Sequence, residues 1–108
     1  MNTQEANNLL EGLIKDTEKK GIVPAKCIPV LQKIREFALK ENDPLVTRSL
    51  RLAWQHLESK EAFEVAFLEE AESQDENFIY LLSLCLKSDN TYNRDELREM
   101  TNLMQETA

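Results

Sequence analysis

The part of the sequence with the most obvious chemistry is a run of acids near its middle. Glu69, Glu70, Glu72, Asp75 and Glu76 place five carboxylates within eight residues. Converging carboxylate oxygens can hold calcium or magnesium. On a helix, however, Glu69, Glu72 and Glu76 would share one face and point into water. The pattern therefore favours a solvated helix end over a metal site, and it makes this run our candidate surface for binding a basic protein partner.

Two other metal-binding patterns lack residues that they require. From Asp89 onward, oxygen-bearing side chains alternate as in a calcium-binding EF-hand loop. Arg94, however, occupies the position that requires glycine, and Met100 the position that requires a bidentate glutamate. One histidine and two isolated cysteines cannot supply a spaced zinc ligand set. We therefore expect no metal and no cofactor.

The only candidate general base of the histidine type is His56, which would have to activate any serine or cysteine nucleophile. Its neighbours form no catalytic motif, so we expect a partly exposed histidine on a helix. Two glycines in the whole chain are too few for a nucleophile elbow or a phosphate loop. The sequence predicts a protein that is not an enzyme, with an unrecognised small enzyme as an alternative, because paired carboxylates depend on fold geometry.

One helix offers a weak sign of nucleic-acid binding. Arg48, Arg51 and Gln55 recur at spacings of three and four, as on a recognition helix. Acids flank this helix, and 20 acids against 13 bases give the chain a formal charge of −7, which repels phosphate backbones. Salt bridges to neighbouring helices are the favoured role for these arginines, and a DNA-associated regulator using Arg48 and Arg51 is kept as an alternative.

Composition indicates an acidic protein of ordinary globular type, with 42% apolar and 31% charged residues. Cys27 and Cys85 lie in apolar helical runs and are expected to be buried thiols in a reducing compartment, without a disulfide. The chain shows no secretory signal pattern and no apolar stretch of membrane-spanning length. We expect a cytoplasmic protein that does not bind membranes.

Apolar residues at spacings of three and four predict helices through most of the chain. The first covers residues 3–20 and stops at Gly21. The second begins with either Pro24 or Pro29 in its first turn and ends near residue 42. Asp43 followed by Pro44 predicts the start of the third, as an N-cap acid with proline behind it.

The second half of the chain is less clearly divided. A fourth helix is expected over residues 60–73, although a single long helix bent near residues 58–60 would explain the same periodicity. A fifth is expected over residues 76–87, capped by Asp75 and apolar nearly all round. Asn93, with Glu96 three positions later, resembles a capping box and is expected to open the last helix.

Together these features predict an all-α protein, a single-domain bundle (residues 1–108) of five or six short amphipathic helices. The function expected is a non-enzymatic protein-protein interaction module, a small acidic adaptor or regulator. Its partner would be another protein, a basic one in the sharper form of this hypothesis, or a second copy of the chain in a homodimer. The homodimer is suggested by an apparent apolar surplus, whose large members are Trp54, Phe63, Phe67, Phe78 and Tyr80.

Overall fold

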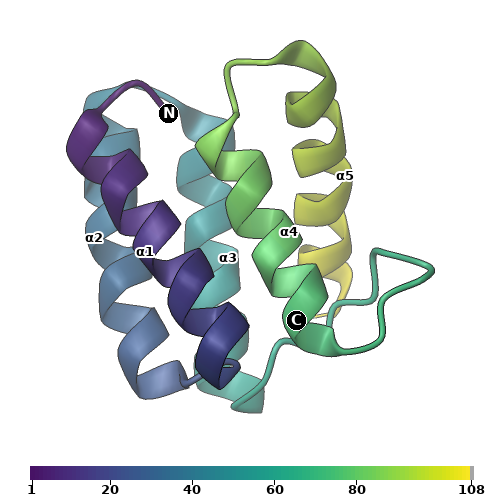
Figure 1. Cartoon of the computed structure of the whole chain (residues 1–108). Helices are drawn as coiled ribbons and strands as arrows, with labels where there is room; N and C mark the ends of the chain where they lie inside the picture. Colours follow the sequence, from purple (N-terminus) through teal and green to yellow (C-terminus); the bar gives the residue numbers. More distant parts are fainter. Residues whose placement is uncertain (108) are drawn as a thin grey trace.

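Five α-helices make up nearly all of the regular structure (Figure 1). The computed structural model describes residues 1–107, and within these residues it contains no strand. The helices are α1 (Gln4–Lys20), α2 (Pro24–Lys40), α3 (Pro44–Lys60), α4 (Gln74–Leu86) and α5 (Thr91–Thr107). The prediction of a small all-α bundle is confirmed.

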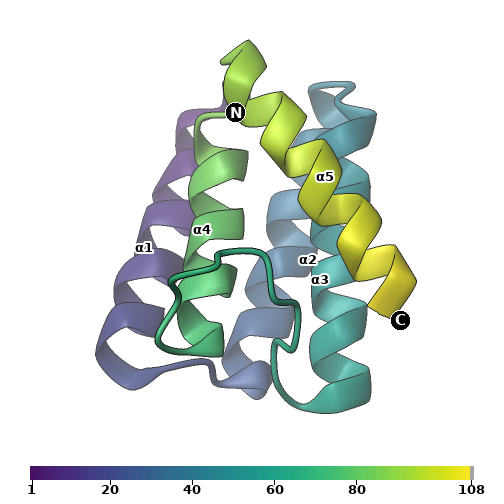
Figure 2. The same ribbon diagram turned by 90° about the vertical axis from the view of Figure 1, so that its right-hand side faces the viewer.

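The helices form a closed ring in which each one packs mainly against two others. The order around the ring is α1, α2, α3, α5 and α4, so α5 lies between α3 and α4. Figure 2 shows that α5 is clearly tilted relative to the other four helices. Consecutive helices α3 and α4 are therefore not neighbours, and the chain between them must cross one face of the bundle.

The helix ends mostly follow the predicted signals. Gly21 adopts a φ of 74°, which a residue without a Cβ tolerates best, and its N–H bonds to the carbonyl of Thr17 at the end of α1. Pro24 occupies the first turn of α2, which leaves Pro29 inside the helix. The carboxylate of Asp43 accepts the N–H of Val46 at 3.3 Å, confirming the predicted N-cap of α3.

The core fills the centre of the ring and draws on every helix. Burial of each large apolar side chain contributes about 1.5–3 kcal/mol. Helix α4 is apolar nearly all round because it contacts α1, α5 and the core together. The largest side chains with almost no exposed surface are Phe63, Phe78, Leu10, Leu31, Ile34, Leu50, Leu57, Leu81, Leu82, Leu97, Met100 and Met104.

This core also absorbs the apparent apolar surplus. Phe63 and Phe78 are fully buried, and Trp54, Phe67 and Tyr80 pack partly buried against the core. Among the described residues, the large hydrophobic side chains that are exposed are Val23, Leu39 and Tyr92. They lie on different parts of the fold, so the apolar content no longer argues for a homodimer.

The helix expected over residues 60–73 is absent, and the alternative of one long bent helix is also wrong. Helix α3 continues to Lys60, and Glu61 then takes a left-handed conformation with φ of 57°, which ends the helix. Residues 62–73 form no helix or strand. Phe63 and Val65 are both buried, two residues apart, which is the spacing of extended chain rather than of a helix.

Two further helix starts differ from the prediction. Helix α4 begins at Gln74 with Ser73 as its N-cap residue, so Asp75 lies inside the first turn. Helix α5 begins at Thr91, because the side-chain oxygen of Asn90 accepts the N–H groups of Tyr92 and Asn93 at 2.9 and 3.3 Å. Asn90 thus performs the capping that was predicted for Asn93.

Candidate functional site

The connection between α3 and α4, residues 61–73, is the least regular part of the described chain. It leaves the lower end of α3 and crosses in front of the lower parts of α2 and α4, on the same side of the bundle as α5 (Figure 2). Connections of this length without secondary structure are uncommon in compact domains and often carry function. We call residues 61–76, which include the first turn of α4, the acidic segment.

Aromatic packing fixes the start of the acidic segment to the core. The ring of Phe63 lies 5.5 Å from the ring of His56, edge-on, and 5.3 Å from that of Phe78. All three side chains are buried. Contacts of this kind contribute about 0.5–1.5 kcal/mol of stability beyond that gained by burying the rings. The segment is therefore held in place despite its irregular backbone.

A buried amide fixes the middle of the acidic segment. Asn77 is 4% exposed, and its side-chain oxygen accepts the N–H groups of Phe67 and Leu68 at 3.0 and 2.8 Å. These two donors have no helix or sheet to pair them, and leaving such groups unsatisfied would be costly. Asn77 therefore substitutes for regular secondary structure at this point.

The structure separates the five predicted binding acids into two sets. Glu69, Glu70 and Glu72 are exposed on the irregular connection. Glu76 is also exposed, and its carboxylate accepts the N–H of Glu72 at 3.1 Å. Asp75 is half-buried and points towards Gly21, where an added Cβ would lie only 3.0 Å from its Oδ2.

The expected single helical face of Glu69, Glu72 and Glu76 does not exist, because Glu69 and Glu72 lie outside any helix. Glu69 and Glu72 lie in the irregular connection, and Glu76 lies in the first turn of α4. We therefore regard the exposed glutamates as the surface set and Asp75 as a contact with the α1–α2 connection.

Charge is distributed very unevenly along the chain. Residues 61–86 contain seven acids and no lysine or arginine, while the rest of the chain holds thirteen acids and thirteen bases. The formal charge of −7 is thus entirely that of residues 61–86. The seven include Glu61 and Glu64, both exposed, which sequence reasoning did not assign to the surface. The absence of lysine and arginine from residues 61–86 is the sequence feature that indicates these two glutamates.

A hollow of about 250 Å³ lies within the acidic segment. Glu64 and Glu72 line it together with apolar groups such as Ala66 and Leu68. Lysine and arginine side chains combine an apolar stem with a cationic end. The hollow therefore offers suitable chemistry for a basic side chain entering from outside.

His56 is buried rather than partly exposed, which corrects the sequence-based expectation. Its Nε2 accepts the backbone N–H of Glu64 at 2.8 Å, so the neutral ring carries its proton on Nδ1. Nδ1 is buried and has no hydrogen-bond partner. In this arrangement neither nitrogen is free to accept a proton from a nucleophile, although His56 and Ser59 line a common cavity of about 170 Å³.

The stability of the protein is expected to decrease as the pH falls below about 6.5, the ordinary pKa of histidine. Burial lowers the pKa of His56, so the unfolded chain takes up a proton before the folded one does. The contribution is present above the unfolded pKa of about 6.5 and is lost as the pH falls towards the lowered pKa of the folded state. Denaturant unfolding at pH 7.5 and 5.5 measures it.

The variant His56→Gln is the matched control for this pH effect, since its side-chain oxygen can still accept the N–H of Glu64. Its loss of stability between pH 7.5 and 5.5 should be clearly smaller than that of the wild type. Equal losses in both proteins would mean that His56 does not cause the pH dependence.

Among residues 1–107, the remaining potential reactive or ligating groups do not come together in a site. Cys27 and Cys85 are free and buried, as predicted, and burial raises the pKa of Cys85 to about 12. Within residues 1–107 no three histidine, cysteine, aspartate or glutamate side chains are grouped as a metal site would require. None of the helices described is long and apolar enough to cross a membrane.

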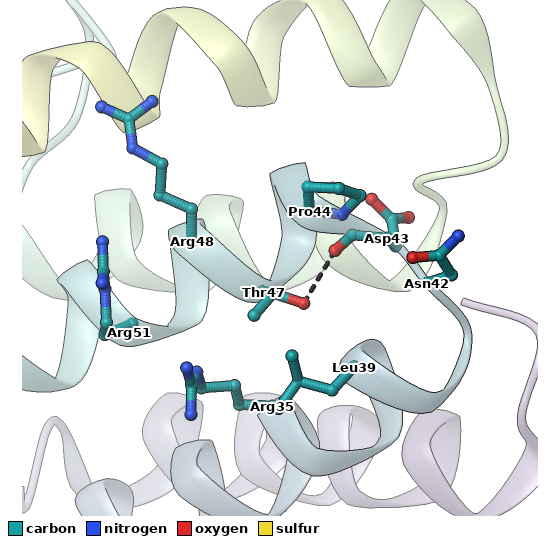
Figure 3. A pocket seen from close by; sticks show the side chains of 8 residues that line it. All are labelled: Arg35, Leu39, Asn42, Asp43, Pro44, Thr47, Arg48 and Arg51. Carbon is teal, nitrogen blue, oxygen red and sulfur yellow. Dashed lines mark hydrogen bonds between the residues drawn. The ribbon is translucent and has the colours of Figure 1, made fainter.

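The arginines of the predicted recognition helix do not form salt bridges to neighbouring helices. In the part of the chain that the structure describes, the ion pairs are Arg94 with Asp43 and Arg98 with Asp95. Arg48 and Arg51 instead line a cleft between α2 and α3, together with Arg35 (Figure 3). The sequence-based expectation for Arg48 and Arg51 was therefore wrong.

Comparison with known proteins does not assign the chain to a family. It matches no protein-family model, no curated protein and no solved structure. Function must therefore be argued from the residues and their geometry.

Proposed function

We propose that this protein is a non-enzymatic interaction module, an acidic adaptor or regulator, whose acidic segment docks on a basic surface of another protein. The observation that carries the proposal is the concentration of the chain's whole formal charge in residues 61–86, around an exposed connection held by Phe63 and Asn77. Attachment to the core means that little ordering entropy is lost when a partner binds.

The acidic segment would act in two ways. Its exposed glutamates create a negative field that accelerates encounter with a basic partner, and salt screens this field. The hollow beside Glu64 and Glu72 would then accept a lysine or arginine side chain, whose apolar stem contacts Ala66 and Leu68. Steering sets the rate of association, and the inserted side chain sets how long the complex lasts.

The proposal includes a cytoplasmic location. Two buried cysteines that form no disulfide favour a reducing compartment.

The test is to remove three exposed charges from the acidic segment. The triple variant Glu69→Gln, Glu70→Gln, Glu72→Gln is expected to bind the partner about tenfold more weakly than the wild type in 0.1 M salt. In 1 M salt, which screens these charges, the affinities of the variant and the wild type should be nearly equal. Quantitative affinity capture from cells that naturally express the protein, with partners identified by mass spectrometry, provides the partner. Titration of that purified partner then gives the affinities.

A matched control removes the same charge elsewhere. Glu5, Glu11 and Glu18 are exposed on α1, and their replacement by glutamine should leave affinity nearly unchanged. Equal weakening by both triple variants would show that only net charge matters, and no weakening by either would place the binding surface elsewhere. Self-association as the sole interaction would favour the homodimer.

The alternative of a DNA-associated regulator has weaker support. Arg48 and Arg51 are accessible at the α2–α3 cleft, but an extended phosphate backbone would also meet the chain's overall negative field. An unrecognised small enzyme has no observation in its favour, since His56 is engaged through Nε2.

A further inference from the structure

The α2–α3 cleft brings three arginines together in a protein that is otherwise strongly acidic. It has a volume of about 270 Å³, near the lower end of the range for small-molecule sites. Arg35 comes from α2, and Arg48 and Arg51 come from α3 (Figure 3). Arg35 and Arg51 lie at equal distances along the chain from Asp43, so a tight antiparallel pair of helices places them opposite each other.

These arginines are not used to hold the fold together by ion pairing. None of the three has a carboxylate partner among residues 1–107. The Nε of Arg35 is buried and has no hydrogen-bond acceptor. A guanidinium presents its N–H donors in a planar fork that matches phosphate, and three guanidinium groups without a carboxylate partner suit the cleft to an anionic ligand.

One of the three arginines is also held in position. The guanidinium carbon of Arg35 lies 5.5 Å from the centre of the Trp54 ring, a cation–π contact that restricts the side chain. Arg48 and Arg51 are three residues apart on α3 and therefore neighbours on its surface. Figure 3 shows the guanidinium groups of Arg35 and Arg51 at the same end of the cleft, with Arg48 extending towards α5.

The single carboxylate that lines the cleft does not cancel this positive charge. Asp43 accepts two hydrogen bonds of 2.9 Å from Arg94 and a third from the N–H of Val46. Arg94 neutralises it, and the cleft keeps the charge of its three arginines. Leu39 and Pro44 add an apolar wall beside them, which suits a ligand with both a charged group and a carbon skeleton.

We propose that the α2–α3 cleft is a binding site for a small phosphorylated molecule, whose phosphate is held by Arg35 and Arg51 with Arg48 beside them. The small volume favours a compact ligand over an extended nucleic-acid backbone, which would need positive charge well beyond the cleft. This inference does not depend on the acidic segment, which belongs to a different part of the chain.

The test uses pyrophosphate as the probe, in low salt, with binding followed by NMR through the backbone amides and the arginine Nε–H groups. Saturable shifts are expected at Arg35 and Arg51 and along the facing parts of α2 and α3. Arg51→Gln changes an exposed side chain and should weaken binding at least tenfold, because a hydrogen bond to a charged group is lost. Arg48→Gln should have a smaller effect.

The matched control is Arg98→Gln, which removes the same charge from an exposed position on α5. It should leave pyrophosphate binding unchanged. If Arg51→Gln and Arg98→Gln weakened pyrophosphate binding equally, the affinity would depend only on net charge, and the proposal would be overturned. Absence of binding at millimolar pyrophosphate would also overturn the proposal. Tighter binding of a duplex oligonucleotide than of pyrophosphate at the same residues would overturn it too, and would favour the DNA-associated alternative.

Discussion

Replacing Phe63 with alanine is expected to lower the free energy of unfolding by about 3–5 kcal/mol, as for other large side chains removed from a core. Phe63 is fully buried and contacts the rings of His56 and Phe78, so its loss leaves a cavity between α3, α4 and the acidic segment. Denaturant unfolding with fluorescence of Trp54 measures this change.

The control for Phe63 is a second phenylalanine from the same connection. Phe67 is only partly buried and stacks on Tyr80 at a ring distance of 5.9 Å. Phe67→Ala should therefore cost clearly less than Phe63→Ala. A cost below about 1 kcal/mol for Phe63→Ala would mean that the connection is not anchored to the core, contrary to its buried position.

The second large effect is expected at Asp43, where alanine should lower the free energy of unfolding by about 2–3 kcal/mol. The N-cap bond to Val46 accounts for about 1 kcal/mol, and the charged hydrogen bonds to Arg94 account for the rest. The pair is partly buried, with 31% of the Arg94 side chain and 18% of the Asp43 side chain exposed, so solvent screens it incompletely.

The variant Asp43→Asn distinguishes the two contributions, because asparagine caps a helix about as well as aspartate but carries no charge. It should recover roughly 1 kcal/mol relative to alanine. The hydrogen bonds from Arg94 lower the pKa of Asp43, so its charge contribution is present above about pH 4 and disappears as the pH falls further. Asp43→Asn should lack that acid-induced loss, and a wild-type profile in the variant would contradict this assignment.

Local signals in the sequence were enough to determine most of the helices. The pair Asp43-Pro44 and the position of Gly21 define helix ends through the few residues next to them, as does the apolar spacing within each helix. The buried state of both cysteines follows from the same spacing. Such features depend on neighbours within one or two helical turns, which is why they can be recognised without the fold.

The acidic segment could be recognised only in part. Five of its acids stand out as a run, but their arrangement depends on which helices become neighbours. Because α4 packs against α1 and α5 rather than against α3, residues 61–73 must cross the bundle, and the local helical periodicity around Phe63 and Phe67 is overridden. That outcome is decided by long-range packing, which periodicity within a short window does not contain.

The two most specific features of the molecule were decided by the tertiary structure alone. His56 is buried because the acidic segment folds back so that the N–H of Glu64 meets its ring. Arg35 joins Arg51 because α2 and α3 pair antiparallel across a short turn at Asp43. In each case residues that are eight or more positions apart meet in space, and the free energy of packing whole helices, rather than any local preference, brings them there.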